Sequence, residues 1–382
     1  MYNKKIIIEF SNCLIKSCLA KIVSLFLPET QFPDYLVSER GNDARDNGYV
    51  FFKYLCEKHP EIKSAYVISN ESPDYPKVNK LGDTIEYGSF RHYIALFKAK
   101  YLVSSHIMGF TPNPGFYIAI SKRKDIFKKK KVFLQHGITK DYIEGLRYPN
   151  TKVDLFICGA KPEYNYISSR YNYPNGVVKY TGLARFDKLN DVETRKEILL
   201  MPTWRKWVNS NTDEEFVKSE YFLRYQGLLS NKKLNVLLAN NGYELVFYPH
   251  YEIQKFIHNF NAGEAVRIAK FSEYDVQDLL KRCEVLVTDY SSVYFDVAYM
   301  GKPIGFYQFD RNQFFESHYA HGYIEEGEIG YLTYSEEDLV NFIHLCIRNE
   351  YDLEEVNSYR KEFFLYHDSK NCERIFREIQ AL

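Results

Sequence analysis

Two histidines stand where strands of this chain are expected to end. His136 follows the apolar run that starts at Val132, and His250 follows the run that starts at Glu244 and ends at Pro249. In open α/β sheets the carboxyl ends of strands border the ligand crevice, and a histidine there can act as a general base near neutral pH. One such histidine is more typical of a structural role than of a catalytic one. Two, in separate halves of the chain, predict a catalytic pair.

Small and hydroxyl-bearing residues around these positions fit the same chemistry. Gly137 lets the backbone turn after the first histidine without a side-chain clash. A second apolar run ends in Thr288-Asp289-Tyr290-Ser291-Ser292, and Asp296 follows one helical turn later. Ser291 or Ser292 can cap a helix, whose free N–H groups and positive dipole end make a phosphate cradle. Capping alone also explains the two serines.

A fourth segment, Thr203-Trp204-Arg205, follows the apolar run that ends at Pro202. The fork of an arginine matches phosphate geometry, so Arg205 is a candidate for pairing with a diphosphate. Trp204 either walls that site or packs at the junction between the two domains.

Alternating strands and helices must position these residues. Strands followed by amphipathic helices predict parallel sheets covered by helices on both faces, and the pattern occurs twice, so we expect two Rossmann-like domains facing a cleft. The predicted strands are 65–69, 84–87, 101–104, 132–135, 154–158, 177–181, 198–202, 244–248, 267–271, 284–288 and 303–307. The predicted helices are 47–57, 222–229, 276–282, 292–300, 336–348, 353–364 and 371–379.

The composition limits the classes of function. The chain has 382 residues, 45% of them apolar, which suits a globular protein of two domains. Lys plus Arg equals Asp plus Glu at 50 each, so the bulk charge gives no nucleic-acid signal and anion recognition must be local. The seven cysteines are scattered without a CxxC pair, which fits a reducing cytosol better than a disulfide framework or a zinc ribbon.

Two segments could contact a membrane. The stretch from Lys4 to Leu27 is apolar and has a helical pattern. Glu9, Lys16 and Lys21 interrupt it, so none of its uncharged runs is long enough to span a bilayer. It either lies flat on a membrane or packs on the first domain. The basic run from Lys122 to Lys131 either docks anionic phosphate or lipid, or is a solvated face.

The ordered combination of motifs resembles the CDP-glycerol glycerophosphotransferase family, the teichoic-acid polymerases and primases, along almost the whole chain. Each motif alone is weak, but their order is specific. The motifs are Glu39–Gly48 (ERGNDARDNG), Leu134–Gly137 (LQHG), Thr181–Asp187 (TGLARFD), Pro202–Arg205 (PTWR), Thr288–Ser292 (TDYSS) and the tail His367–Ile375.

The resemblance implies a GT-B-like fold with an acceptor-side domain at residues 1–190 and a CDP-polyol domain at 191–360. A C-terminal helix at 361–382 would pack back on the first domain. The family's two important histidines carry over to His136 and His250, although here Pro249 precedes rather than follows the second one. We expect the remaining substrate contacts from Gly137, Thr203, Trp204, Arg205, Thr288, Asp289, Tyr290, Ser291, Ser292 and Asp296.

The implied reaction transfers glycerol phosphate from CDP-glycerol to a hydroxyl of a lipid-linked or polymer acceptor, in teichoic-acid or capsule synthesis, and releases CMP. We expect no metal and no cofactor, no nucleic-acid partner, and a cytoplasmic protein peripheral on the inner face of the cell membrane, in contact with anionic lipid. CDP-ribitol is the alternative donor, and both primase and polymerase activity stay open. A GT-B glycosyltransferase that uses a nucleotide sugar, and a non-enzymatic scaffold, are the rival interpretations.

Overall fold

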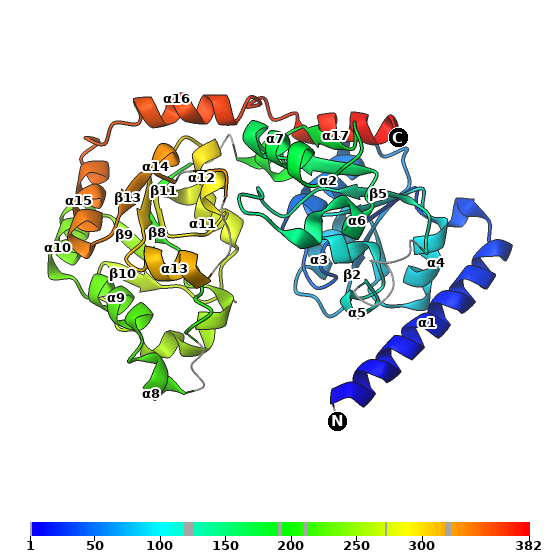
Figure 1. Ribbon diagram of the computed structural model, residues 1–382, viewed down its shortest axis with the longest axis horizontal. Coiled ribbons are helices and arrows are strands. Elements are labelled where there is room, and N and C mark those ends of the chain that lie inside the picture. The colour runs from blue at the N-terminus through cyan, green and yellow to red at the C-terminus, as the bar shows by residue number, and fades with distance from the viewer. Residues whose placement is uncertain are drawn as a thin grey trace. The chain divides into compact units, whose positions relative to one another are not determined.

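The computed structural model describes residues 2–117, 126–189, 193–208, 212–271, 273–317, 322–324 and 326–382, which form two compact units (Figure 1). Unit 1 comprises Met1–Ile138, Ile143–Lys188 and Tyr366–Leu382. Unit 2 comprises Thr139–Tyr142 and Leu189–Leu365. Each unit contains its own parallel sheet with helices packed on it, so the predicted fold class of two Rossmann-like α/β domains is confirmed.

The sheet of unit 1 has the strand order β3-β2-β1-β4-β5-β6-β7, and its neighbouring strands are parallel. Its middle strands are continuous apolar runs; all four residues of β6 are buried, as a strand covered on both faces requires. The strands are β1 (Tyr35–Ser38), β2 (Ser64–Ile68), β3 (Asp83–Glu86), β4 (Tyr101–Ser104), β5 (Lys130–Phe133), β6 (Leu155–Cys158) and β7 (Val178–Tyr180).

The strand order of unit 1 reverses between β1 and β4. Ligands of open α/β sheets bind outside the carboxyl ends of strands at such a switch point. The residues that follow β1, β4 and β5 are therefore expected to converge there, and these are Glu39-Arg40, Ser105-His106 and the segment that ends at His136.

Helices cover both faces of this sheet. Ser89 caps α4 by accepting a hydrogen bond from the His92 backbone N–H, and Asp46 does the same for Asn47 at the start of α2. The helices of unit 1 are α1 (Tyr2–Phe26), α2 (Asn47–Lys58), α3 (Tyr75–Leu81), α4 (Phe90–Lys98), α5 (Pro114–Phe116), α6 (Tyr148–Thr151), α7 (Lys161–Arg170) and α17 (Asn371–Gln380).

The last helix belongs to unit 1, as the prediction of a returning C-terminal helix requires. The Asp187 carboxylate accepts hydrogen bonds from the backbone N–H groups of Asn371 and Cys372, both at 2.8 Å, and so caps α17. Gly182 is required beside it: its φ is +79°, and a Cβ there would lie 2.1 Å from Oδ1 of Asn371. The motif around Thr181–Asp187 thus fastens the end of the chain.

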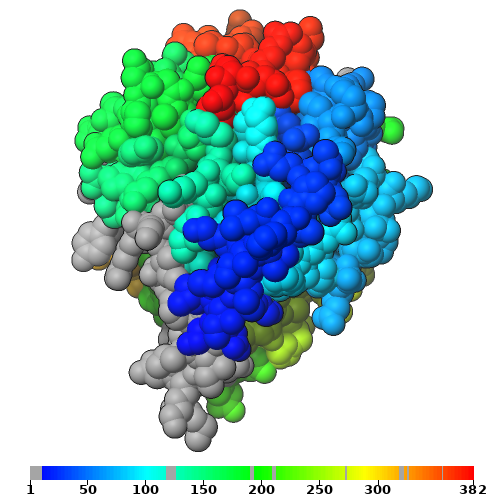
Figure 2. Space-filling view, turned by 90° about the vertical axis from the view of Figure 1, so that its right-hand side faces the viewer, coloured from blue at the N-terminus to red at the C-terminus, as the bar shows by residue number. Residues whose placement is uncertain are grey.

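Helix α1 has two different faces. Cys13, Ser17, Ala20 and Ser24 recur at helical spacing and are buried, and the Tyr93 hydroxyl on α4 donates to the Cys13 sulfur at 3.1 Å. The opposite face is open along the surface of the unit (Figure 2). In the part of the chain with described coordinates, no helix has the length and apolar content to cross a bilayer. Both interpretations of the N-terminal stretch therefore keep a physical basis.

The basic run lies only partly within the described residues, since 118–125 are outside them. Of the remainder, Lys130 and Lys131 open β5. The Lys130 ammonium lies 3.1 Å from Asp154, and the Lys131 backbone N–H donates to the same carboxylate at 2.9 Å. This end of the run has a structural role at the start of the strand.

Unit 2 repeats the architecture with the strand order β10-β9-β8-β11-β12-β13, again with parallel neighbours. The order reverses between β8 and β11, so the segments after these strands should converge. The strands are β8 (Arg195–Leu200), β9 (Glu244–Phe247), β10 (Val266–Ile268), β11 (Cys283–Thr288), β12 (Ile304–Tyr307) and β13 (Tyr331–Thr333).

The helices of unit 2 surround a core rich in Phe, Tyr and Leu. Gly242, with φ +69°, ends α10 in the left-handed conformation that glycine favours. The helices are α8 (Asp213–Phe216), α9 (Glu220–Leu229), α10 (Lys232–Asn241), α11 (Val276–Arg282), α12 (Tyr294–Tyr299), α13 (Arg311–Ser317), α14 (Glu326–Ile329), α15 (Glu336–Ile347) and α16 (Glu354–Phe363).

Every predicted strand is present, with bounds that differ by at most three residues. Two strands were missed. Strand β1, at the centre of the first sheet, and β13, at the edge of the second, have only four and three residues. Such short apolar runs do not show a period of their own.

Candidate active site

The turn after β5 presents His136 through a strained backbone. Gln135 has φ +59°, a conformation that costs a residue other than glycine about 1 kcal/mol or more. Its buried side chain is held twice: Nε2 donates to the Ile157 carbonyl at 2.9 Å and to Oε1 of Glu163 at 2.8 Å. We expected the conformational freedom of this turn at Gly137, but the left-handed residue that the structure records in it is Gln135.

Two residues from distant motifs hold the same turn. The Asn47 side chain donates to the Gln135 carbonyl at 2.7 Å and accepts from the Arg185 backbone N–H at 2.9 Å. The Arg185 guanidinium donates to the His136 carbonyl and to Asp46, both at 2.8 Å. Buried networks of this kind fix a single geometry. The motifs around Asn47 and Arg185 therefore set the position of the histidine.

His136 lines a cavity of about 360 Å³ in unit 1. The ring of His106 stacks on it, with centroids 4.8 Å apart and an interplanar angle of 18°. Nε of Arg40 donates to Nε2 of His106 at 3.2 Å. The cavity is lined by Glu39, Arg40, Tyr87, His106, Ile107, Met108, Gly109, Pro114, Phe133, His136 and Leu146, so most of its wall is apolar.

The surroundings of His136 favour its neutral form. Closely packed groups around the ring, followed by the positive charges of Arg185 and Arg40, lower its pKa below the usual value of 6.5, although the residue keeps surface that is exposed to solvent. The pKa of His106 is lowered to about 3 by burial, His136 and Arg40. A neutral imidazole that solvent and substrate can reach is able to accept a proton at pH 7.

The motif at Glu39–Gly48 folds into a compact loop beside this cavity. The Glu39 carboxyl accepts hydrogen bonds from the backbone N–H groups of Arg45, Asp46 and Tyr49 at 2.8–3.1 Å. Gly41 has φ +87°, and a Cβ there would lie 2.4 Å from the Tyr87 ring, so the loop requires glycine. The loop delivers Arg40 to the cavity.

In unit 2, Arg205 lies at the centre of a buried ion network. Its side chain has no exposed surface and contacts Asp289 at 2.8 Å and Asp310 at 2.6 Å. The ring of Tyr290 lies 4.9 Å from the guanidinium carbon, and the Tyr290 hydroxyl donates to Asp310 at 3.0 Å. This burial corrects the expectation that Arg205 pairs with a diphosphate, because two protein carboxylates already occupy its guanidinium.

Asp289 joins the two central strands of unit 2. Its carboxylate accepts from the Thr203 backbone N–H at 2.9 Å and from the Tyr225 hydroxyl at 3.1 Å. The Thr288 hydroxyl donates to the Met201 carbonyl at 2.7 Å. The segments after β8 and β11 are thus tied together at the switch point, and Trp204 packs against the core of unit 2.

The helix after Thr288-Asp289 begins later than expected. Helix α12 starts at Tyr294 with Val293 at its N-cap, and no side chain caps it. The expectation that Ser291 or Ser292 caps this helix is therefore wrong: both serines lie in the preceding turn, half-buried, and the Ser291 hydroxyl is 3.5 Å from the Val293 nitrogen. Asp296 is buried inside α12.

His250 is exposed just beyond β9, as expected for the second strand-end histidine. It precedes the 3-10 helix η6 (Tyr251–Asn259), and its Nδ1 accepts from the Glu252 backbone N–H at 3.3 Å. Partial removal of water from the ring lowers the pKa of His250, against the opposing effect of Glu252 and Asp289. The second imidazole is also poised to be neutral at pH 7.

Each unit therefore carries the strand-end histidine that the sequence predicts, His136 or His250, and a buried arginine that holds adjacent segments in place. Sequence reasoning missed Arg40, His106 and Arg185 as single residues, although Arg40 and Arg185 lie in motifs that it singled out. His106 follows strand β4 by two residues, so the rule that strand ends border the site was the available signal.

Comparison with known proteins gives a match over most of the chain. The family model described as CDP-Glycerol:Poly(glycerophosphate) glycerophosphotransferase matches residues 21–381. The minor teichoic acid biosynthesis protein GgaB of Bacillus subtilis (strain 168) is 33% identical over 96% of this chain and 42% of its own length. A teichoic acid poly(glycerol phosphate) polymerase of the same organism is 23% identical over 71% of this chain and 38% of its length. This chain spans less than half of either relative.

A solved structure of the wall teichoic acid polymerase TagF has a similar fold. The TM-score is 0.68 with 15% identity, and the match covers 100% of this chain and 99% of that chain. At this identity the likeness concerns the fold alone.

Proposed function

This chain belongs to the CDP-glycerol:poly(glycerophosphate) glycerophosphotransferase family, and we propose that it transfers glycerol phosphate from CDP-glycerol to an acceptor hydroxyl and releases CMP. We further propose that the acceptor is a lipid-linked molecule or a growing polymer of teichoic-acid type, because both relatives are named for teichoic acid synthesis or polymerisation. The product is the acceptor lengthened by one glycerol phosphate unit.

The observation that carries the proposal is the over-determined turn at His136. Hydrogen bonds donated by Asn47 and Arg185, and one accepted by Glu163, hold a strained backbone so that one neutral imidazole faces a cavity. Strain of this kind persists only where the surrounding structure enforces it, and it is concentrated at functional sites. A core histidine would need neither the strain nor the cavity.

In the proposed reaction the acceptor oxygen attacks the β-phosphorus of CDP-glycerol, which bears the glycerol. The new O–P bond forms as the bond between this phosphorus and the bridging oxygen breaks, and CMP leaves with the bridging electrons. His136 takes the proton of the attacking hydroxyl. Such a base contributes about 10²–10⁴-fold to the rate.

Unit 2 would hold the donor. His250 and the turn at Ser291-Ser292 follow strands of this unit, and both present polar atoms that solvent reaches. We propose that they stabilise the diphosphate as charge develops on the leaving group. Arg205 contributes indirectly: its ion pair with Asp289 holds that residue in place, and with it the turn that contains the two serines.

The test is nucleotide release by the purified protein, with CDP-glycerol, CDP-ribitol and a nucleotide sugar supplied in turn with a glycerol-phosphate primer; polyol-phosphate transfer releases CMP, and glycosyl transfer releases the nucleoside diphosphate. We expect release with CDP-glycerol and a loss of at least ~100-fold in His136→Ala and His250→Ala at unchanged far-UV circular dichroism. Release from the nucleotide sugar instead, or full activity in both variants, would overturn the proposal. Product lengths in the same reactions separate a primase from a polymerase.

We also propose that α1 lies on an anionic membrane surface. Its outer face repeats apolar residues at helical spacing, and Ile15, Leu19, Ile22 and Phe26 are 57, 51, 56 and 82% exposed. Exposed lysines at positions 16 and 21 flank the stripe and complement anionic headgroups. A lipid-linked acceptor would be presented at the same surface.

Vesicle co-sedimentation tests this contact. Vesicles of phosphatidylglycerol and phosphatidylcholine should retain the wild type at low salt and release a variant with Leu19→Glu and Ile22→Glu. Val236→Glu is the matched control, because Val236 is 58% exposed on α10 of unit 2. Equal binding of all three proteins, or no binding by the wild type, contradicts the membrane role of α1.

A further inference from the structure

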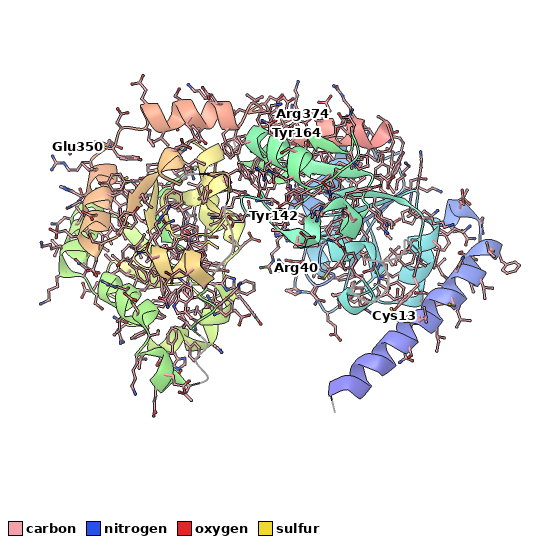
Figure 3. All side chains as sticks on the ribbon, viewed as in Figure 1. Cys13, Arg40, Tyr142, Tyr164, Glu350 and Arg374 are labelled. Carbon is pink, nitrogen blue, oxygen red and sulfur yellow. The ribbon has the colours of Figure 1, made fainter. Side chains whose placement is uncertain are left out.

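Arg40 is a cation without a counter-charge in the cavity of His136. Figure 3 labels it on the side of unit 1 away from Cys13, the residue of α1 that packs on α4. Its Nε donates to His106, and among the described residues no carboxylate forms an ion pair with its guanidinium. Arg185, in contrast, is paired with Asp46.

The hydrogen bond to His106 fixes the orientation of the Arg40 guanidinium. A bond from Nε to Nε2 of His106 requires that nitrogen to be unprotonated; the lowered pKa of His106, about 3, keeps the ring neutral, and the bond selects the tautomer with its proton on Nδ1. The two terminal nitrogens of the guanidinium then remain for a ligand. They form a fork that matches the oxygens of a phosphate.

The carboxyl group on the same wall does not cancel this charge. Glu39 lines the cavity, but its oxygens accept three backbone hydrogen bonds, two from its own loop and one from Tyr49 in α2. Burial and the neighbouring Asp46 raise the pKa of Glu39 above its usual range. The cavity therefore offers one fixed positive charge next to a neutral histidine.

The spacing of these groups suits a polyol phosphate. The His136 and His106 rings are 4.8 Å apart, and Arg40 is bonded to the far ring at 3.2 Å. In a terminal glycerol phosphate unit the free hydroxyl and the phosphorus are roughly 6 Å apart, from four or five bonds of about 1.5 Å. A hydroxyl at His136 thus brings the phosphate of its own unit to the neighbourhood of Arg40.

We propose that Arg40 binds the phosphodiester that precedes the attacking hydroxyl, so that the preferred acceptor ends in a polyol phosphate unit rather than in a neutral sugar. This inference rests on the proposed function and deepens it. It assigns the loop at Glu39–Gly48 to recognition of the acceptor end. His106 is a positioning residue that aims Arg40.

Binding without turnover gives the first test. The probe is glycerophosphoglycerol, two glycerols joined by one phosphodiester, titrated calorimetrically into the full chain. Replacing a charge-assisted fork with a neutral amide in Arg40→Gln should weaken binding ~10- to 100-fold. Arg170→Gln, at an exposed arginine in the last turn of α7, should bind as the wild type does. Equal affinity in Arg40→Gln and the wild type overturns the inference.

Kinetics with two acceptors give the second test, independent of the first. Arg40→Gln should raise KM ~10-fold or more for a primer that ends in glycerol phosphate, and should leave KM for CDP-glycerol and KM for a primer that ends in a neutral saccharide unchanged. A rise in KM for CDP-glycerol, or equal losses on both primers, overturns it. If the wild type releases no CMP from CDP-glycerol, the proposed function fails, while the calorimetric result still decides whether Arg40 binds a phosphodiester.

Discussion

The buried network around Arg205 makes a prediction that separates a structural from a substrate-binding arginine. Arg205→Met removes the guanidinium and leaves Asp289 and Asp310 in a site where neither carboxylate is more than 3% exposed. Removing one partner of a buried pair typically costs about 3–5 kcal/mol, because the remaining charge is uncompensated. We expect the free energy of unfolding of unit 2 to fall by that amount.

The two carboxylates do not share this cost equally. Without Arg205, Asp289 still accepts from the Thr203 N–H, the Tyr225 hydroxyl and the Tyr290 N–H, whereas Asp310 keeps the Tyr290 hydroxyl. Adding Asp310→Asn to Arg205→Met should therefore restore most of the lost free energy of unfolding. The double variant should be more stable than the sum of the single losses by about 1–3 kcal/mol.

Tryptophan fluorescence reads the unfolding of this unit alone, since the two tryptophans of the chain are Trp204 and Trp207, both in unit 2. With a urea m-value of about 2 kcal/mol/M, Arg205→Met should lower the midpoint by roughly 1.5–2.5 M. The control is Arg224→Met: Arg224 pairs with Glu220 while 49% exposed, and an exposed pair contributes about 0–1 kcal/mol. An unshifted urea midpoint in Arg205→Met, together with a raised KM for CDP-glycerol, would refute the structural role. It would indicate instead that Arg205 binds the diphosphate of the donor.

Three further predictions concern unit 1. Asn47→Ala loses the amide that links the Gln135 carbonyl to Arg185, so kcat for CMP release should fall about 10- to 100-fold at nearly unchanged KM for CDP-glycerol; an unaltered kcat would show that the turn holds without it. Because the pKa of His136 is lowered, its base form persists below pH 6.5 and is lost only as the pH falls through the depressed pKa. The acidic limb of the kcat/KM profile should therefore have its midpoint below pH 6.5, and a midpoint above that pH argues against His136 as the base. Burial lowers the pKa of His92 to about 4, so below pH 6.5 the unfolded chain binds a proton that the folded chain does not bind. The free energy of unfolding should therefore fall by about 2 kcal/mol between pH 7 and 5, measured by urea titrations followed by circular dichroism. His92→Asn should make the free energy of unfolding less dependent on pH, whereas an equal pH dependence in both proteins would contradict the lowered pKa of His92.

Much of the fold could be predicted because its signals are local. A buried parallel strand reads as an apolar run, and β6 and β11 are such runs between helical patterns. Strand β1 escaped because four residues beside Pro33 and Asp34 carry no periodicity. Its central place in the sheet comes from pairing with β2 and β4, which are distant in sequence.

The candidate site was predictable in position but not in detail. His136 and His250 follow strands, so the sequence indicates their places. The left-handed backbone at Gln135 depends on Asn47 and Glu163, which are 88 and 28 residues away. Because these contacts are distant in sequence, no local pattern predicts this conformation. The start of α12 at Tyr294 was misjudged for the converse reason: Ser291-Ser292 has the local chemistry of a cap, but the backbone places both residues in the turn before the helix.

The roles of the motif arginines show where sequence reasoning stops. Arg40, Arg185 and Arg205 each lie in a segment after a strand, and by residue type all three are candidates for binding phosphate. The carboxylates that reach them decide the outcome, since Asp46 pairs with Arg185, and Asp289 and Asp310 enclose Arg205. Arg40 meets a neutral imidazole instead. Of these three arginines, Arg40 is the one for which the described part of the chain supplies no carboxylate partner, and for this reason we propose it as the one that recognises an anionic substrate.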